Sequence, residues 1–288
     1  MESSLRIDRT VTLRNPVIVA AFSGWNDAAQ AATDTIRHLM KEYNADQIAS
    51  IDAESHVDYQ AHRPEVVLVD GVVREIRWPR FDVYAAQTPG ARDMVLLLGV
   101  EPNYQWVKFI RSIRELAGAV GATQLITLGA LLADVPHTRE PQLTGSASDA
   151  LMNRIGMQRS TYEGPTGIIG AIHDACHRDG FDSVSLWVPV SHYINQSPNP
   201  VAVRALVRGL GKASGVDIPE WDLDASVEQW RTQVNAVVAD DDDITEYVHD
   251  LEERSDAAPL VTPVESEIPS ADELGAAFEE FLREQPGT

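Results

Sequence analysis

Polar side chains that could bind a ligand or transfer a proton follow several apolar runs of the sequence. The run at 17–22 leads into Trp25-Asn26-Asp27, and later runs lead into segments that carry carboxylates and imidazoles. A carboxylate and an imidazole in one cleft can serve as acid and base. The side chains of interest are Trp25, Asn26, Asp27, Glu101, Asn103, His137, Glu163, Thr166 and His192.

If the apolar runs form parallel strands, their carboxyl ends meet at one edge of the sheet, where α/β proteins bind ligands. We therefore expect a cleft for a ligand or a partner at this edge, with Glu101, Glu163, His137 and His192 near one another. The alternative interpretation is purely structural, because Gly and Pro shape turns while Asn, Thr and Asp cap helices.

A second candidate site lies at Thr144-Gly145-Ser146, which precede a stretch with helical spacing. Free backbone N–H groups at a helix start can hold a phosphate, so these residues could form an anion site. Equally, Ser146 can be the helix N-cap, with Asp149 completing a capping box. Both interpretations are open from the sequence.

Motifs of common cofactor and metal enzymes are incomplete. No G-x-G-x-x-G follows the first strand, and no G-x-S-x-G nucleophile elbow occurs. The segment H-D-A-C-H at 173–177 lacks the Glu of zinc proteases, and the single Cys176 excludes a multi-cysteine zinc cage. We expect no metal and no cofactor, and the lack of a complete catalytic constellation favours a non-enzymatic protein without settling the question.

The fold class follows from alternating strand and helix patterns. Apolar or β-branched runs predict strands at 17–22, 47–51, 66–69, 83–86, 94–99, 124–128 and 184–189. Helical spacing of apolar residues occurs at 27–43, 103–120, 146–155, 166–177 and 200–212, and again at 224–238 and 244–254. This alternation predicts an α/β fold with a mainly parallel sheet flanked by helices, and the Arg-rich segment 63–86 is consistent with a hairpin-like excursion.

Charge divides the chain unevenly. Residues 217–288 hold 21 acidic and three basic side chains, which leaves 23 acidic and 20 basic ones elsewhere in a chain of net charge −21. We predict an α/β core domain at 1–215, an acidic helical subdomain at 216–255, and a flexible linker with a terminal helix or tail at 256–288. Nucleic-acid binding needs clustered Lys and Arg, and the sequence has no such cluster.

The sequence also predicts a cytoplasmic protein without membrane contact. No run approaches the ~18 apolar residues of a membrane-spanning helix. The start of the chain lacks the basic segment and following apolar segment of a secretion signal.

Seven segments, taken in order, carry a family resemblance. They read S-G-W-N-D-A (23–28), G-V-E-P-N (99–103), L-G-A-L-L-A-D-V-P-H-T (128–138), T-G-S-A-S-D (144–149), Y-E-G-P-T-G-I-I-G (162–170), S-L-W-V-P-V-S-H-Y (185–193) and D-D-D-D-I-T-E-Y-V (240–248). Together they resemble the bacterial, actinobacterial branch of the proteasome assembly chaperone 2 family. The likeness covers about residues 15–253.

The resemblance implies a core like the phosphorylase/hydrolase fold of nucleoside phosphorylases, with a helical C-terminal addition. It also implies self-association, for which we favour a trimer, and a chaperone or scaffold function with proteasome subunits as partners. Relatives that dock on proteasome rings often end in a hydrophobic residue, a Tyr and one final residue. This sequence ends Gln285-Pro286-Gly287-Thr288, so docking by a terminal peptide is not expected.

The alternative function is that of a small-molecule enzyme or sensor. It would be of the phosphorylase-like or predicted carboxylate–amine ligase type, and it would use the cleft at the carboxyl ends of the strands.

Overall fold

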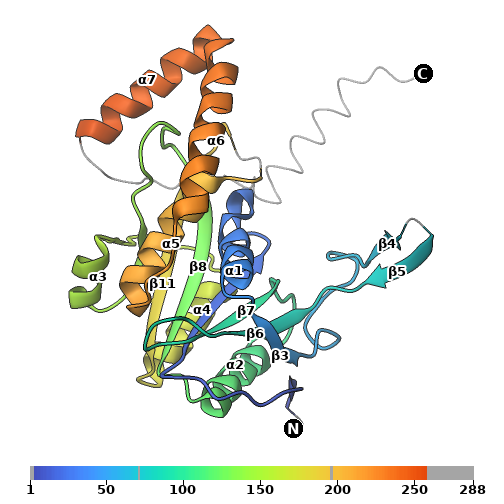
Figure 1. Ribbon diagram of the computed structural model, residues 1–288. Coiled ribbons are helices and arrows are strands. Elements are labelled where there is room, and N and C mark those ends of the chain that lie inside the picture. The colour runs from blue at the N-terminus through green and yellow to red at the C-terminus, as the bar shows by residue number, and fades with distance from the viewer. Residues whose placement is uncertain (1–2, 71, 195–196, 258–288) are drawn as a thin grey trace, which may run out of the picture.

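The computed structural model of the protein describes residues 3–70, 72–194 and 197–257. Its main element is a nine-stranded sheet (Figure 1). The strand order is β1-β3-β6-β7-β2-β8-β11-β9-β10. The four central strands run parallel and are β7 (Met94–Val100), β2 (Val17–Ser23), β8 (Gln124–Ala133) and β11 (Asp182–Ser191). Their long apolar runs follow from this position, because a central parallel strand is buried on both faces.

The flanks make the sheet mixed. On one side β6 (Phe81–Ala86), β3 (Asp46–Ile51) and β1 (Leu5–Ile7) pair antiparallel with their neighbours. On the other, β9 (Thr144–Ser146) is antiparallel to β11, and β10 (Gln158–Arg159) is parallel to β9. Residues 87–93 between β6 and β7 are too few for a helical crossover, so these strands must be antiparallel. The α/β prediction is confirmed.

Helices cover both faces of the sheet (Figure 1). One face carries α1 (Ala31–Glu42), preceded by a short 3₁₀ turn η1 (Ala28–Gln30), with α5 (Pro200–Ser214) and α3 (Asp149–Ile155). The other face carries α2 (Trp106–Val120) and α4 (Ile168–Arg178). Strand β2 alternates between the two cores, with Val17 and Val19 facing one and Ile18 and Phe22 the other, as a period of two residues requires.

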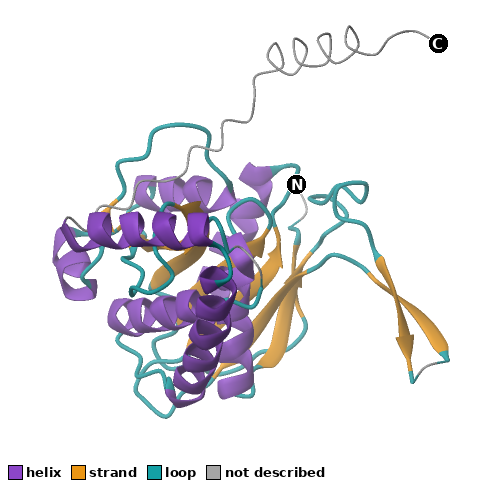
Figure 2. Cartoon of the chain, turned by 90° about the horizontal axis from the view of Figure 1, so that it is seen from above, coloured by secondary structure: helices purple, strands orange, loops and turns teal. Residues whose placement is uncertain are grey.

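A two-stranded hairpin projects from the body of the molecule, as Figures 1 and 2 show. Its strands β4 (Glu65–Val69) and β5 (Val73–Arg77) pair only with each other, antiparallel. The expected hairpin-like excursion is confirmed for this part, whereas β6, at the end of the same Arg-rich segment, returns to the main sheet.

Two further helices, α6 (Trp221–Ala239) and α7 (Asp242–Ala257), follow the α/β core. The nearly buried Arg204 of α5 donates to Asp224 of α6 (2.8 Å) and to Glu140, and Glu140 also accepts from Arg231 of α6 (2.9 Å). A buried guanidinium that lost these carboxylates would be strongly destabilising, so they fix α6 on α5.

Helix α7 is held by ion pairs from Arg139 to Glu252 (3.1 Å) and Asp256 (2.9 Å). At its start Asp241 Oδ1 accepts the N–H groups of Asp243 (3.0 Å) and Ile244 (3.1 Å), so part of the four-Asp run caps the helix. The helix continues to Ala257, two residues into the predicted tail, and the rest of that tail lies outside the described residues. The division into core and acidic subdomain stays a prediction. Among the described helices, none combines the length and apolar character needed to cross a bilayer.

The indole of Trp187 on β11 lies across Gly129, its register partner on β8. A Cβ on Gly129 would lie 2.6 Å from the Trp187 ring, closer than van der Waals contact. We expect Gly129→Ala to lower the free energy of unfolding by about 1–3 kcal/mol, because the indole cannot move without disturbing the packed face. Urea unfolding measures this.

Gly118→Ala is the matched control, because a Cβ on this exposed residue of α2 meets nothing within 4 Å. The free energy of unfolding of this variant should rise by about 0.5–1 kcal/mol, because Ala has a higher helix propensity than Gly. Equal effects of the two substitutions would contradict the packing argument.

Candidate functional site

An open pocket of about 400 Å³ lies at the carboxyl ends of β2 and β7. Four segments contribute to its wall: the turn after β2, the loop after β3, the loop between β7 and α2, and the turn before α4. The lining residues are Gly24, Trp25, His62, Glu101, Pro102, Asn103, Trp106, Pro165, Thr166 and Gly167. Four of the predicted cleft residues are therefore together here: Trp25, Glu101, Asn103 and Thr166.

Glu101 joins β7 to α4 across this pocket. Its backbone N–H donates to Ser23 O (2.8 Å), and its Oε1 accepts the N–H of Ile168 (2.8 Å) at the start of α4. An N-terminal helix N–H has no partner within the helix, so a carboxylate is favourable at this point. The contact requires glycine at Gly167, where a Cβ would lie 2.6 Å from Glu101 Oε1.

Two indoles form the aromatic part of the pocket wall. Trp25 is 58 % exposed and lies against Gly167, whose added Cβ would be 3.4 Å from its ring. The Trp106 Nε1–H donates to Pro102 O (2.5 Å), which fixes the plane of that ring at the start of α2. The polar edge of Trp106 is therefore satisfied within the protein, while its half-buried ring packs on the core and also lines the pocket.

Asn26 and Asp27 lie beneath the pocket rather than in it, and both are buried. Asn26 donates through its side-chain Nδ2 to Phe22 O (2.9 Å), and its backbone carbonyl accepts the N–H of Ala130 on β8 (2.9 Å). Asp27 accepts the N–H groups of Ala32 (2.9 Å) and Thr33 (3.1 Å) and the Thr33 hydroxyl (2.6 Å). Burial raises the pKa of Asp27, and the bonds from Thr33 and Ala32 oppose that shift. The structural interpretation holds for both residues.

Asn103 also has a structural partner. Its Oδ1 accepts the N–H of Asp58 (2.9 Å), and its backbone N–H donates to His56 O (2.8 Å). These bonds hold the loop after β3, which brings His62 to the pocket. Sequence reasoning missed His62 because that loop shows no motif, and it missed Trp106 because an aromatic at a helix start is an ordinary core position.

The two predicted histidines lie elsewhere, between the core and the C-terminal helices. His137 is buried, with Nδ1 2.9 Å from the Tyr193 hydroxyl and Nε2 2.9 Å from Asn235 Oδ1 of α6. His192 has Nδ1 3.1 Å from Asp134 Oδ1 and packs edge-on against Tyr247 of α7. The space beside His137 is only about 20 Å³, so this part of the rim is filled. The expected meeting of Glu101 and Glu163 with these histidines in one pocket is wrong.

The reason for this separation is the C-terminal addition. Helices α6 and α7 fold over the carboxyl ends of β8 and β11, and their side chains occupy that half of the rim. Glu163 is exposed on the loop before α4 and does not line the pocket, whereas Thr166 of the same loop does.

The residues of the predicted anion site form a strand of the main sheet. Thr144, Gly145 and Ser146 form β9, paired with β11 on one side and β10 on the other, and a Cβ on Gly145 would lie 1.8 Å from Ser185 O. The N-cap of α3 is Ser148, so the capping-box assignment for Ser146 is wrong. The Ser146 hydroxyl instead lies 3.0 Å from His173 Nε2. A strand paired on both edges has no row of free N–H groups, and this disfavours phosphate at these residues.

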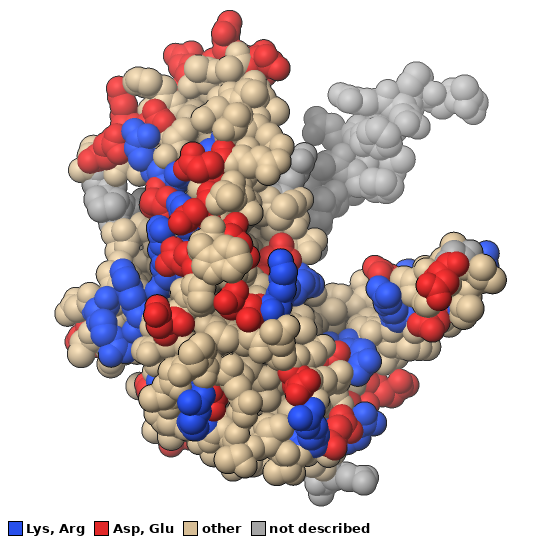
Figure 3. Space-filling view, viewed as in Figure 1, with Lys and Arg blue, Asp and Glu red and all other residues tan. Residues whose placement is uncertain are grey.

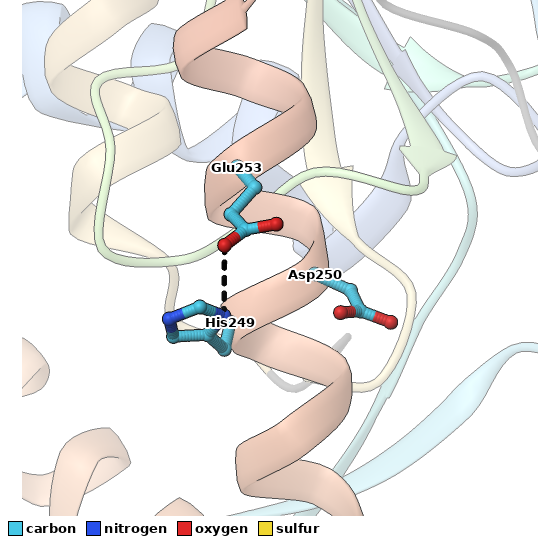
Figure 4. A group of neighbouring side chains, drawn as sticks. All are labelled: His249, Asp250 and Glu253. Atoms are coloured by element: carbon cyan, nitrogen blue, oxygen red, sulfur yellow. Dashed lines mark ion pairs between the residues drawn. The ribbon is translucent and has the colours of Figure 1, made fainter.

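Within the described residues, metal-ligating side chains cluster on α7, at His249, Asp250 and Glu253 (Figure 4). All three are exposed, and His249 Nδ1 lies 3.6 Å from Glu253 Oε1, one helical turn along. A carboxylate oxygen of Asp250 lies within 4.8 Å of the ligand atoms of that pair. Such spacing is that of a surface ion pair on a helix.

The contacts of His137 predict a pH dependence. Burial lowers the pKa of His137 from its ordinary value of 6.5, although the bond to Asn235 opposes this. A base whose pKa is lowered on folding contributes stability above its unfolded pKa that is lost as the pH falls. Burial likewise lowers the pKa of His56 and of His173. We expect the free energy of unfolding to decrease as the pH falls below 6.5.

His137→Asn should show a weaker pH dependence than the unmodified protein when both are unfolded in urea at several pH values. His249→Asn, at an exposed position of α7, should leave the dependence unchanged. Parallel pH profiles for the protein and His137→Asn would overturn the assignment.

The comparisons with known proteins agree with this architecture. The model of the PAC2 family matches residues 21–238. A PAC2 family protein from Streptomyces avermitilis is 39% identical, with a TM-score of 0.74 over 81% of this chain and 99% of that one. The proteasome-assembly chaperone homologue of Mycobacterium tuberculosis is 41% identical, with a TM-score of 0.75 over 81% and 99%.

The archaeal proteasome activator PbaB of Pyrococcus furiosus shares the fold, at 16% identity and a TM-score of 0.62 over 81% of this chain and 97% of that one. No curated protein matches the chain. The family model spans most of the α/β core and α6, and two relatives near 40% identity each cover 81% of this chain. The chain therefore belongs to the PAC2 family.

Proposed function

We propose that this protein is a non-enzymatic chaperone or scaffold that self-associates in the cytoplasm and binds proteasome subunits. Its likeness to the proteasome-assembly chaperone homologue of M. tuberculosis supports that class of partner. The predicted rim residues do not combine into a catalytic group, because His137 and His192 serve the packing of α6 and α7. The observation that carries self-association is the apolar surface of the β4–β5 hairpin.

This hairpin exposes apolar side chains on a ribbon that stands clear of the body (Figures 1 and 2). Val66 is 63 % and Ile76 57 % exposed, and the two are cross-strand partners on one face. Leu68, Val72 and Val73 are also exposed. A two-stranded hairpin is marginally stable alone in water, and contiguous exposed apolar patches mark interaction surfaces. A second copy of the chain is the occupant that we propose for it.

The acidic helices offer a different surface. Figure 3 shows Asp and Glu gathered over the end of α6 and along α7. Their exposed carboxylates include Asp240, Asp242, Asp243, Glu246 and Asp250. Such a surface attracts basic partners and repels anionic ones, so we assign it to contacts with a basic protein surface.

A small-molecule sensor or enzyme is the second candidate, and the pocket beside Trp25 is the observation that favours it. Its lining, as far as the structure describes the chain, contains neither Lys nor Arg, so phosphate esters and carboxylates are poor candidates for its ligand.

The hairpin makes a testable contribution to assembly. Val66→Thr combined with Ile76→Thr keeps β-branched residues on the ribbon but places hydroxyls on its apolar face. We expect the unmodified chain to sediment as an oligomer and the double variant to associate at least about tenfold more weakly. Sedimentation equilibrium of both proteins at several concentrations gives the comparison.

Val107→Thr is the control, since Val107 is 78 % exposed on α2 and outside the hairpin. It should leave the oligomer unchanged. A monomeric unmodified chain, or a double variant that associates as strongly as the unmodified chain, would exclude the hairpin as the contact.

The proteasome assignment has its own test. Purified from its own host under native conditions, the chain should carry proteasome α-subunits or their precursors, because an assembly factor binds the unassembled form. Deletion of its gene should slow the appearance of complete 20S particles. Unchanged proteasome assembly, together with a purified chain free of proteasome subunits, would refute the assignment.

A further inference from the structure

The pocket beside Trp25 holds a carboxylate without a counter-charge. Glu101 is half-buried in the lining, and among the described residues neither Lys nor Arg forms an ion pair with it. One oxygen, Oε1, is committed to the N–H of Ile168, and Oε2 has no partner there. Removing a charge from water is costly unless an opposite charge compensates it, so a cationic guest would gain from this position.

A second acceptor lies beside the first. Asn26 is fully buried, its Nδ2 is committed to Phe22 O, and its Oδ1 has no hydrogen-bond partner in the described part of the chain. A Cβ added to the pocket residue Gly167 would lie 3.1 Å from Asn26 Oδ1 and 2.6 Å from Glu101 Oε1. The Asn26 oxygen is buried beneath the pocket and does not line it, so Glu101 is the acceptor that a ligand can reach. Among the described lining residues, only His62 can carry a positive charge, and it forms no ion pair with Glu101.

The remaining wall suits an aliphatic chain that ends in a positive charge. Trp25 and Trp106 both line the pocket, and indole rings attract ammonium and guanidinium groups. Pro102 and Pro165 add apolar contact without donors of their own, because proline has no N–H. The volume of about 400 Å³ exceeds what one side chain needs and admits part of a neighbouring backbone.

We propose that this pocket binds an organic cation, a guanidinium or protonated amine on an aliphatic chain, with Glu101 as the counter-ion and Trp25 and Trp106 as the aromatic walls. The cation can come from an Arg or Lys side chain of a partner polypeptide or from a free amine. This inference goes beyond the proposed function, because it concerns the ligand of the pocket whichever protein is the partner.

The test uses the full-length protein and calorimetric titration with four probes. They are the peptide acetyl-Gly-Arg-Gly-amide, its norleucine analogue, free diaminopentane and an acetyl-Gly-Glu-Gly-amide control. We expect the Arg peptide to bind in the micromolar to millimolar range, and the norleucine and Glu peptides at least about tenfold more weakly. Saturation by diaminopentane as well would make a free amine sufficient, and binding of the Arg peptide alone would identify a polypeptide source.

Three variants locate the binding. Glu101→Gln removes the charge but keeps an oxygen that can accept from Ile168, so the fold should survive while cation affinity falls about tenfold or more. Trp25→Leu should also weaken binding, because Trp25 is mostly exposed and its loss removes a π face. Glu163→Gln, an exposed carboxylate outside the pocket, is the matched control and should bind normally.

No binding of either cation at millimolar concentration, equal binding of the norleucine peptide, or unchanged affinity in folded Glu101→Gln would overturn the inference. These outcomes are separate from the proteasome assignment. A chain that binds cations but no proteasome subunit keeps the pocket assignment and loses the proposed function.

Discussion

Strand β2 is buried as far as Phe22, and the chain is buried again at Asn26 and Asp27, so the backbone N–H and C=O groups there need partners. Asn26 and Asp27 meet that requirement. The Asn26 side-chain amide donates to Phe22 O, and the Asn26 backbone carbonyl accepts from Ala130 on β8. The Asp27 carboxylate accepts the free N–H groups at the start of α1. These hydrogen bonds fix the turn after β2 to β2 itself, to β8 and to α1, and Trp25 in this turn is exposed.

The opposite wall of the pocket depends on the same need of backbone N–H groups for acceptors. Helix α4 begins beside the end of β7, and Glu101 accepts its Ile168 N–H because Gly167 leaves room for the carboxylate. Two polar residues that resemble catalytic groups in sequence thus serve helix starts. What remains available to a ligand is the second carboxylate oxygen of Glu101 and the indoles that line the pocket.

The molecule presents two unlike surfaces for association. Helices α6 and α7 are fixed by paired charges, from Arg204 to Asp224 and from Arg139 to Glu252, so their acidic outer face has a defined position. The β4–β5 hairpin is held by its own ladder and leaves its apolar side chains in water. The first surface suits an electrostatic encounter, whereas the second suits a tight contact that excludes water.

The sequence alone determined the α/β class, the seven strands with strong apolar runs and the order of helices, because a buried strand and an amphipathic helix each leave a local periodicity. It did not list β5 of the hairpin as a strand, and it missed the short strands β1, β9 and β10, whose two or three residues carry no period. It predicted that Trp25, Glu101, Asn103 and Thr166 share a cleft, and they line one pocket. It also predicted His137 and His192 in that cleft, and they lie elsewhere. Only the tertiary structure separated these histidines, because α6 and α7 return over the rim, and no local pattern records which strand ends a distant helix will cover.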